Sequence, residues 1–203
     1  MSISDFDPEQ QNQHIESRII ASLERIAQAF RVLLWEESKE FSLSPIQVQV
    51  LIFLRYHEEG KRKVSYLAEE LNVTKATVSD TIKALEQKRL ITKSYELNDT
   101  RSFLIHLTEE GRAVAEKTSL FTRQLQIPIH QLGDADKENL LVSLIGIIRS
   151  LNQAGIITVQ RMCLTCVYYQ LPAPGQHFCR LLNQNLRTTD LRVDCPEHVM
   201  NPA

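Results

Sequence analysis

Residues 45–111 constrain the fold more than any other part of this 203-residue chain. Ser65 is placed to cap a short helical pattern, YLAEEL, and an Asn-Val link follows it directly. Thr74 then stands as the cap of KATVSDTIKALEQKRL, whose apolar positions recur at helical spacing. The sequence therefore predicts two helices joined by a tight turn.

Two short strands are predicted directly after the second helix. Residues 91–97 and 103–107 are rich in β-branched and aromatic residues, and the turn sequence NDTR separates them. Ser-Pro at 44–45 and Thr108 mark the starts of flanking helices, and the helix after Thr108 is expected to end just before Pro128. The order helix, tight turn, helix and hairpin predicts a mainly α fold with a small β wing, the winged helix-turn-helix.

The second helix of this pair has the polar face that a DNA-recognition helix needs. At 100° per residue, Val78, Ile82 and Leu85 form a buried stripe, and small or hydrogen-bonding side chains lie opposite. Such a face fits the major groove, while the helix N-terminus suits phosphate. The predicted DNA contacts in this region are Ser65, Thr74, Lys75, Ala76, Thr77, Ser79, Asp80 and Lys83. The alternative is an amphipathic helix with an ordinary solvated face.

The charge distribution agrees with a polyanion partner for the same region. Residues 61–101 carry 9 Lys and Arg against 6 Asp and Glu, whereas residues 1–60 carry 5 against 10. Because the phosphate backbone attracts basic surface, the first of these segments is the one expected to touch nucleic acid. An excess of three charges is also compatible with ordinary scatter.

The hairpin sequence supports a specific family resemblance. DTRSFLIHLTEEG at 99–111 has the form D-x-R-x5-L-T-x2-G and resembles the wing signature of the MarR family of bacterial transcription regulators. The similarity covers about residues 15–153. It implies a DNA-binding repressor or activator and not an enzyme, with Arg101 in the minor groove and Asp99 orienting it. Outside that setting the same pair would be an exposed turn contact.

The helices that flank residues 45–111 are predicted to dimerise the protein. Residues 15–41 and 113–153 show more apolar surface than a small winged domain can cover, so a second copy should bury it. The resemblance implies the same homodimer, and two recognition helices then read a near-palindromic double-stranded operator. In many relatives a small-molecule effector binds between the dimer helices and the DNA-binding lobe; nothing in this sequence identifies one.

These observations divide the chain into three parts. Residues 1–14 are predicted to be a disordered tail, residues 15–155 the MarR-like domain, and residues 156–203 an extension. The N-terminus is acidic and polar rather than a signal peptide, and the apolar run at 140–148 is too short to cross a bilayer. The expectation is a cytoplasmic protein with no membrane partner.

All four cysteines fall in the extension. Cys163, Cys166, Cys179 and Cys195 follow the spacing C-x2-C-x12-C-x15-C. In a reducing compartment, clustered cysteines favour a metal or redox site over structural disulfides. A segment so short, which is also interrupted by proline and glycine at 172–175, usually needs a staple to fold. The four thiols are therefore predicted to be metal ligands.

Three chemistries compete for these thiols. The preferred hypothesis is a [4Fe–4S] cluster, because the spacing resembles that of high-potential iron–sulfur proteins and Tyr168, Tyr169 and Phe178 would screen it. Structural zinc, held by all four thiols or with His198, is the first alternative. A disulfide switch is the second, and four unlinked cysteines remain a fourth reading. His177 and His198 are expected to support the ligands or lie at the surface.

The leading functional hypothesis joins these parts into a redox-, oxygen- or iron-sensing transcription regulator. The rival, from a different class, is a thiol or iron–sulfur redox protein that uses the winged domain for docking. The sequence has no glycine-rich phosphate loop and no GxSxG, and no βαβ pattern surrounds its single CxxC.

Overall fold

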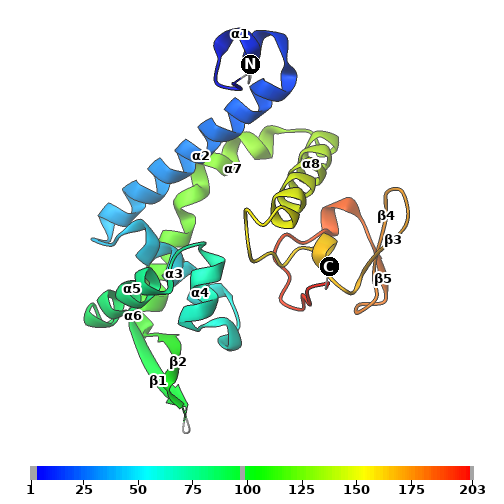
Figure 1. Cartoon of the computed structure of the whole chain (residues 1–203). Helices are drawn as coiled ribbons and strands as arrows, with labels where there is room; N and C mark the ends of the chain where they lie inside the picture. The colour runs from blue at the N-terminus through cyan, green and yellow to red at the C-terminus, as the bar shows by residue number, and fades with distance from the viewer. Residues whose placement is uncertain (1–3, 97–98, 202–203) are drawn as a thin grey trace.

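The computed structural model describes residues 4–96 and 99–201, without the side chains of residues 96–101. Three parts are visible in Figure 1: a helical arm, a winged lobe formed by residues 45–111, and a cysteine module formed by residues 156–201. The arm links the other two parts, which lie side by side and are in direct contact with each other. The predicted mainly α fold with a small β wing is confirmed.

The winged lobe has the predicted order of elements. Its elements are α3 (Pro45–Tyr56), η1 (Glu59–Lys61), α4 (Val64–Glu70), α5 (Lys75–Gln87), β1 (Ile91–Glu96) and β2 (Asp99–Leu107). Ser44 and Gln47 form a capping box at the start of α3, as the Ser-Pro signal predicts. The cap of α4 is Lys63 rather than Ser65, and it makes no side-chain capping bond, so Ser65 instead lies in the first turn of the helix.

One apolar core holds these elements together. Leu51, Leu67, Val78 and Leu85 are fully buried in it, so α3, α4 and α5 share a common interior. The wing is an antiparallel pair that begins with Ile91 opposite Leu107, and Ile105 of β2 is also fully buried. Because alternate side chains of each strand point to the same face, the apolar side chains at the base of the wing pack into this core.

Helix α6 (Glu109–Thr118) is locked against the end of α5 by the last residues of the wing motif. Thr108 caps α6 by accepting from the Gly111 N–H at 3.0 Å, and its hydroxyl donates to the Arg89 carbonyl at 2.9 Å. A Cβ on Gly111 would lie 1.9 Å from the Leu90 carbonyl oxygen. Glycine is therefore required here for close approach of two backbones.

The helical arm departs from the prediction at the N-terminus. It contains α1 (Pro8–Gln13), α2 (Ile15–Glu40), η2 (Ser119–Thr122), α7 (Arg123–Gln131) and α8 (Asp134–Gln153). Residues 8–13, expected within a disordered tail, form a helix capped by Asp7, which accepts from the Glu9 N–H at 3.0 Å. The Ser17 hydroxyl, bonded to Asp5 at 2.7 Å, ties this helix to α2. These local caps correct the predicted tail.

The break in the second arm segment also lies elsewhere than predicted. The helix that begins at Thr108 ends at Thr118, not before Pro128, and Pro128 lies inside α7. The buried Thr118 hydroxyl donates to the carbonyls of Val114 at 2.9 Å and Ala115 at 3.3 Å. Hydroxyl bonds of this kind compete with the helical ladder and favour a bend.

The cysteine module contains a second sheet that the sequence patterns did not reveal. Its elements are η3 (Cys163–Thr165), β3 (Tyr169–Ala173), β4 (Gln176–Cys179), β5 (Gln184–Leu186) and η4 (Thr188–Asp190). The strands form an antiparallel sheet in the order β3-β4-β5. Met162 is fully buried against Ile145 of α8, so the module packs on the last arm helix.

Candidate DNA-binding surface and cysteine site

The predicted DNA contacts on α5 lie together on one exposed face. Val78, Ile82 and Leu85 are buried as predicted, and Thr81 joins them. The exposed residues from the predicted set are Thr74, Lys75, Ala76, Thr77, Ser79, Asp80 and Lys83, with Ser65 exposed on α4 nearby. Apart from the stem of each lysine, this face presents no large apolar side chain, so another backbone can approach it closely.

Hydrogen bonds at the start of α5 determine which polar atoms remain available. The Thr74 hydroxyl oxygen accepts from the Thr77 N–H at 3.1 Å and lies 2.9 Å from the Thr77 hydroxyl. Ser79 donates its hydroxyl proton to the Lys75 carbonyl at 2.8 Å. Ser79 therefore offers acceptor lone pairs outward, which suits the amino groups of adenine or cytosine.

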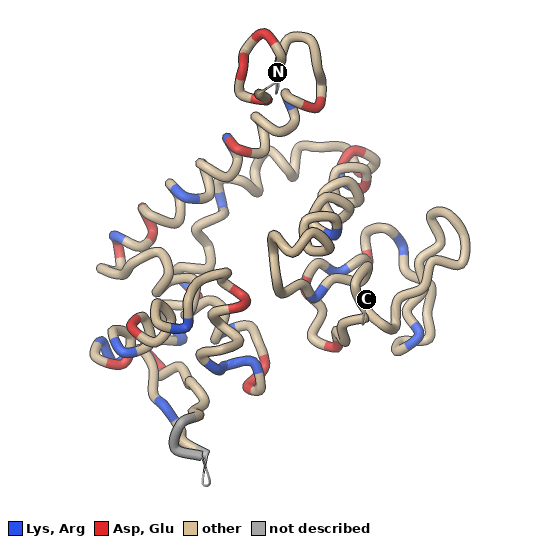
Figure 2. The backbone as a smooth tube through the Cα atoms, in the orientation of Figure 1, with Lys and Arg blue, Asp and Glu red and all other residues tan. Residues whose placement is uncertain are grey.

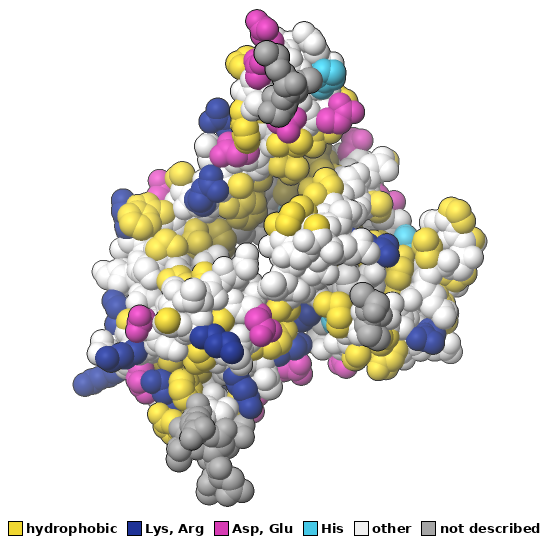
Figure 3. Space-filling view, viewed as in Figure 1, with side chains coloured by type: hydrophobic (Ala, Val, Ile, Leu, Met, Phe, Trp, Pro, Cys, Tyr) yellow, Lys and Arg dark blue, Asp and Glu magenta, His cyan; other side chains and the backbone are white. Residues whose placement is uncertain are grey.

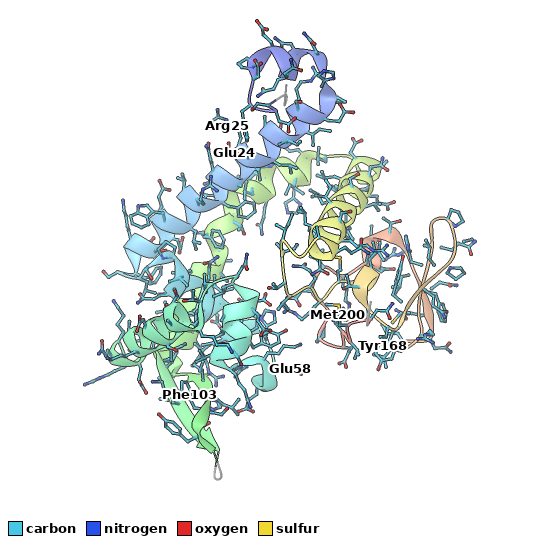
Figure 4. All side chains as sticks on the ribbon, in the orientation of Figure 1. Glu24, Arg25, Glu58, Phe103, Tyr168 and Met200 are labelled. Atoms are coloured by element: carbon cyan, nitrogen blue, oxygen red, sulfur yellow. The ribbon has the colours of Figure 1, made fainter. Side chains whose placement is uncertain are left out.

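The wing continues this surface. Asp99 and Arg101 belong to β2, but their side chains lie outside the described residues, so their predicted minor-groove role stays a prediction. Tyr95 and Phe103 pack edge to face across the strands, with ring centroids 5.7 Å apart, and Figure 4 marks Phe103 on the wing. Lys93 is held by Glu86 at 2.6 Å and lies over the Phe103 ring, which stiffens the wing against α5.

Basic residues accompany this surface, as the charge count predicts. Figure 2 shows Lys and Arg positions distributed over the winged lobe, while acidic positions mark the N-terminal end of the arm. Lys88, at the end of α5, donates to the Ser42 carbonyl at 2.7 Å and thereby fixes α5 to the segment before α3. The orientation of the exposed face is therefore set by polar contacts as well as by the core.

The four cysteines converge on one cavity. Cys163, Cys166, Cys179 and Cys195 line a cavity of about 420 Å³ together with aromatic and aliphatic side chains such as Tyr169. All four are free thiols and half-buried. In the part of the chain that the structure describes, no group of three or more Cys, His, Asp or Glu side chains is arranged to hold one metal ion.

Two donors from Arg192 face the thiol sulfurs. Its backbone N–H points at Cys163 Sγ over 3.3 Å, and its guanidinium Nη1 lies 3.8 Å from Cys195 Sγ. Burial raises the pKa of the Cys163 thiol; the Arg192 N–H opposes this, and the neighbouring thiols reinforce it. The cysteines are thus close enough to influence one another electrostatically.

Both histidines of the module are engaged with neighbours. His198 Nε2 lies 3.0 Å from the Thr165 hydroxyl, and burial lowers the pKa of His198. His177 Nδ1 lies 2.7 Å from the Tyr169 hydroxyl and stacks on that ring. These contacts agree with the expected supporting role, although they leave the ligand set itself a prediction.

A polar seam between the winged lobe and the cysteine module was missed by sequence reasoning. At its centre, Arg161 is 7% exposed and makes bidentate bonds to Glu70 (2.6 and 3.1 Å) and to Asp194 (2.6 and 3.0 Å). Burial alone would lower the pKa of Arg161. The carboxylates of Asp194 and Glu70 have the larger effect and leave the pKa of Arg161 raised. Burial likewise opposes ionisation of Asp194, yet bonds from Arg161 and His57 bring its pKa down to about 2.

None of the helices within residues 4–96 and 99–201 combines the length and the apolar character needed to cross a membrane.

Comparisons with known proteins agree with the geometry of the winged lobe. A sequence profile of the MarR family matches residues 41–102. An uncharacterised HTH-type transcriptional regulator of Bacillus subtilis, YhbI, is 26% identical over 134 residues, which are 64% of this chain and 87% of that protein. The HTH-type transcriptional repressor MdtR of the same species is 34% identical over 95 residues, 47% of this chain and 60% of that protein.

A solved structure shows the same likeness in three dimensions. The Staphylococcus aureus MepR–DNA complex superposes with a TM-score of 0.57 and 26% identity, covering 64% of this chain and 96% of that one. Each of these likenesses leaves more than a third of the present chain unmatched. Proteins of this family are DNA-binding regulators and not enzymes. Residues 41–102 are thus similar in sequence to the MarR family, and the fold around them is the winged helix-turn-helix of that DNA-bound regulator.

Proposed function

We propose that this protein is a homodimeric transcription regulator that binds double-stranded DNA through α5 and the wing. The observation that carries the proposal is the exposed polar face of α5, which lies beside the hairpin in a MarR-family lobe. The relative MdtR is named a repressor and MepR has been crystallised with DNA, which supports a repressor here as well.

The helical arm supports the proposed homodimer. Ile19, Ile26, Phe30 and Trp35 of α2 are each more than 40% exposed, and the only buried residues of that 26-residue helix are two serines. Figure 3 shows hydrophobic side chains over α2 and along the hollow between α2 and α8. Apolar surface of this extent favours a partner copy. A two-fold dimer then calls for a near-palindromic operator.

Selection of duplexes from a random library, followed by fluorescence anisotropy at several salt concentrations, tests DNA binding. We expect affinity to fall steeply with salt, and Arg101→Ala and Lys83→Ala each to weaken binding and reduce the salt slope by about one. Arg187→Ala is the matched control, because Arg187 is an exposed cation of the cysteine module. Equal losses in all three variants would count against the assigned surface.

We further propose that the four cysteines hold a [4Fe–4S] cluster. The convergence of Cys163, Cys166, Cys179 and Cys195 on one cavity supports a group that all four thiols share. Its wall is partly aromatic and aliphatic, as suits a cluster shielded from water. Such a cluster, when bound, is a redox centre whose potential depends on hydrogen bonds to its sulfurs.

Mononuclear zinc is the main alternative to a cluster at these thiols. Zinc needs its ligands about 2.0–2.3 Å from one centre. In the described residues, no group of three such side chains is arranged to hold a single ion. Structural zinc held by the same thiols and a thiol switch, which also starts from four free cysteines, are therefore the alternatives that metal analysis must distinguish from the cluster.

Anaerobic purification with iron, zinc and acid-labile sulfide analysis tests the cluster. We expect iron and sulfide in equal amounts and broad visible absorption near about 400 nm, as for thiolate-bound clusters. Both signals should be lost in Cys163→Ser and retained in Gln176→Ala, which changes an exposed residue of β4. Colourless protein with about one zinc per chain would refute the cluster and leave the DNA-binding proposal standing.

A further inference from the structure

The seam around Arg161 joins the two sites just described. On the module side, Arg161 lies two residues before Cys163, and its partner Asp194 lies one residue before Cys195. Their backbones pair as a parallel bridge, and the Cys195 N–H donates to the Arg161 carbonyl at 2.8 Å. Any displacement of these two cysteines therefore also moves both charged groups of the seam.

On the lobe side, Arg161 grips the helix that precedes the recognition helix. Its guanidinium bonds both Glu70 oxygens and, at 3.0 Å, the Tyr66 hydroxyl, so both contacts fall on α4. Next to them, the Thr158 hydroxyl donates to the Glu69 carbonyl at 2.7 Å. These bonds hold the end of α4 directly before the turn that leads to Thr74 and α5.

A second branch of the seam reaches α3. His57, at the end of that helix, stacks on Phe53 with ring centroids 3.9 Å apart and bonds Asp194 at 2.8 Å. The Arg161 guanidinium lies 5.8 Å from the Phe53 ring centroid. Figure 4 places the neighbouring Glu58 on the side of the winged lobe that faces the module. The seam thus contacts both helices on which α5 packs.

From this geometry we infer that Arg161 is a positioning residue that transmits the state of the cysteine site to the recognition helix within one chain. When the four cysteines hold their cluster, Arg161 and Asp194 are fixed and α4 is held in place. When the cluster is lost, the segments at 161–163 and 192–195 relax, and the grip on Glu70 loosens. The inference rests on the proposed function, since it requires both the DNA surface and the cluster.

The test compares DNA affinity of the full chain with and without its cluster. Operator binding is measured anaerobically for wild type and Glu70→Gln, before and after removal of the cluster by an iron chelator. For wild type we expect the two dissociation constants to differ by about tenfold, within the usual range of allosteric coupling. For Glu70→Gln we expect the same visible absorption but a difference of less than about twofold.

Glu116→Gln is the matched control. Glu116 of α6 accepts two bonds from Arg55 of α3 at 3.0 and 2.7 Å, so the variant breaks an Arg–Glu pair that ties the lobe to α6, away from the module. It should keep the wild-type difference. A purely structural role for Glu70 would lower affinity equally in both states, whereas the inferred role changes the ratio between them.

Hydrogen exchange of residues 64–74 provides a second measurement, which does not depend on DNA. Loss of the cluster should speed exchange there in wild type and have little effect in Glu70→Gln. The inference would be overturned if Glu70→Gln binds its cluster and still shows the wild-type ratio between the dissociation constants before and after cluster removal. So would wild-type protein that binds DNA equally in both states, although the proposed function would survive that result. Wild type without iron and sulfide would refute the cluster proposal too, and the metal analysis identifies that case.

Discussion

The winged lobe and the cysteine module reach their folds by different means. Among the described residues, the core of the lobe contains sixteen buried apolar side chains: fourteen come from the lobe itself, and Leu43 and Ala115 come from the segments on either side of it. The module contributes only Met162, Leu186 and Leu191 to a core that it shares with Ile145 of α8. Burial of apolar area scales with the number of such side chains, so the lobe has a driving force that the module lacks.

This difference in buried apolar side chains indicates which interactions stabilise each part. The lobe is held by a continuous apolar interior and by helix caps, which need no external group. The module is made of short strands and 3-10 turns around half-buried thiols, and small folds of this kind depend on a metal or a covalent link. Perturbations should therefore separate the two parts.

Removal of one of the proposed metal ligands should have the largest effect. Cys166→Ser, or chelation of the native protein, is expected to abolish hydrogen-exchange protection throughout residues 161–201, because the binding free energy is part of the folding free energy. Protection in α3 and α5 should persist. If the module of Cys166→Ser exchanged as slowly as wild type, its fold would be independent of the thiol site and the contrast would be lost.

A cavity in the lobe core should do the reverse. Leu85 is fully buried, and Leu85→Ala is expected to destabilise the lobe by about 2–5 kcal/mol, from lost transfer energy and the void left behind. Urea unfolding followed by far-ultraviolet circular dichroism measures this loss. The exposed neighbour Gln87→Ala is the control and should change stability by less than about 0.5 kcal/mol.

A pair of glycine substitutions sharpens the comparison further. Gly111→Ala places a methyl group against the Leu90 carbonyl, and the backbone shift should cost about 1–3 kcal/mol. Gly146, within α8, has open space around its Cα, so Gly146→Ala should instead stabilise the arm by about 0.4–1 kcal/mol. Thermal unfolding of both variants should show shifts of opposite sign; a raised melting temperature in Gly111→Ala would contradict the close approach seen at Gly111.

A further small and local effect concerns the start of α5. Thr74→Ala removes the hydroxyl that accepts from the Thr77 N–H and should cost about 1 kcal/mol. Thr74→Ser keeps the acceptor and should be nearly neutral. Exchange rates of the first-turn amides of α5 report the local fraying, and unchanged rates in Thr74→Ala would show that the cap is dispensable.

Much of the winged lobe was predictable because its signals are local. Three helices begin at a capping side chain that bonds the backbone N–H three residues later, namely at Ser44, Thr74 and Thr108. The apolar stripe of α5 follows from the helical spacing of its apolar residues. The break after Thr118 was missed, since a proline at 128 is an obvious signal and a back-bonding hydroxyl is not. The sheet of the module was missed because its strands are short and mostly exposed.

The seam was beyond reach for a different reason. Arg161 meets Glu70 and His57 across about a hundred residues of chain, and no periodic pattern encodes such a meeting. The clue in the sequence was position, because a cation lies two residues before one cysteine and an anion lies one residue before another. Ionisable groups that neighbour candidate ligands therefore merit attention as interface residues in chains of this design.

The bond from Arg192 to Cys163 Sγ has a consequence for how this module tolerates change over time. The donor is the peptide N–H, so nearly any residue at position 192 supplies it, and proline alone removes it. The guanidinium near Cys195 belongs to the side chain and is lost with the arginine. Substitution of Arg192 can therefore change the polarity around Cys195 Sγ, while Cys163 Sγ keeps its backbone donor with any residue other than proline at that position.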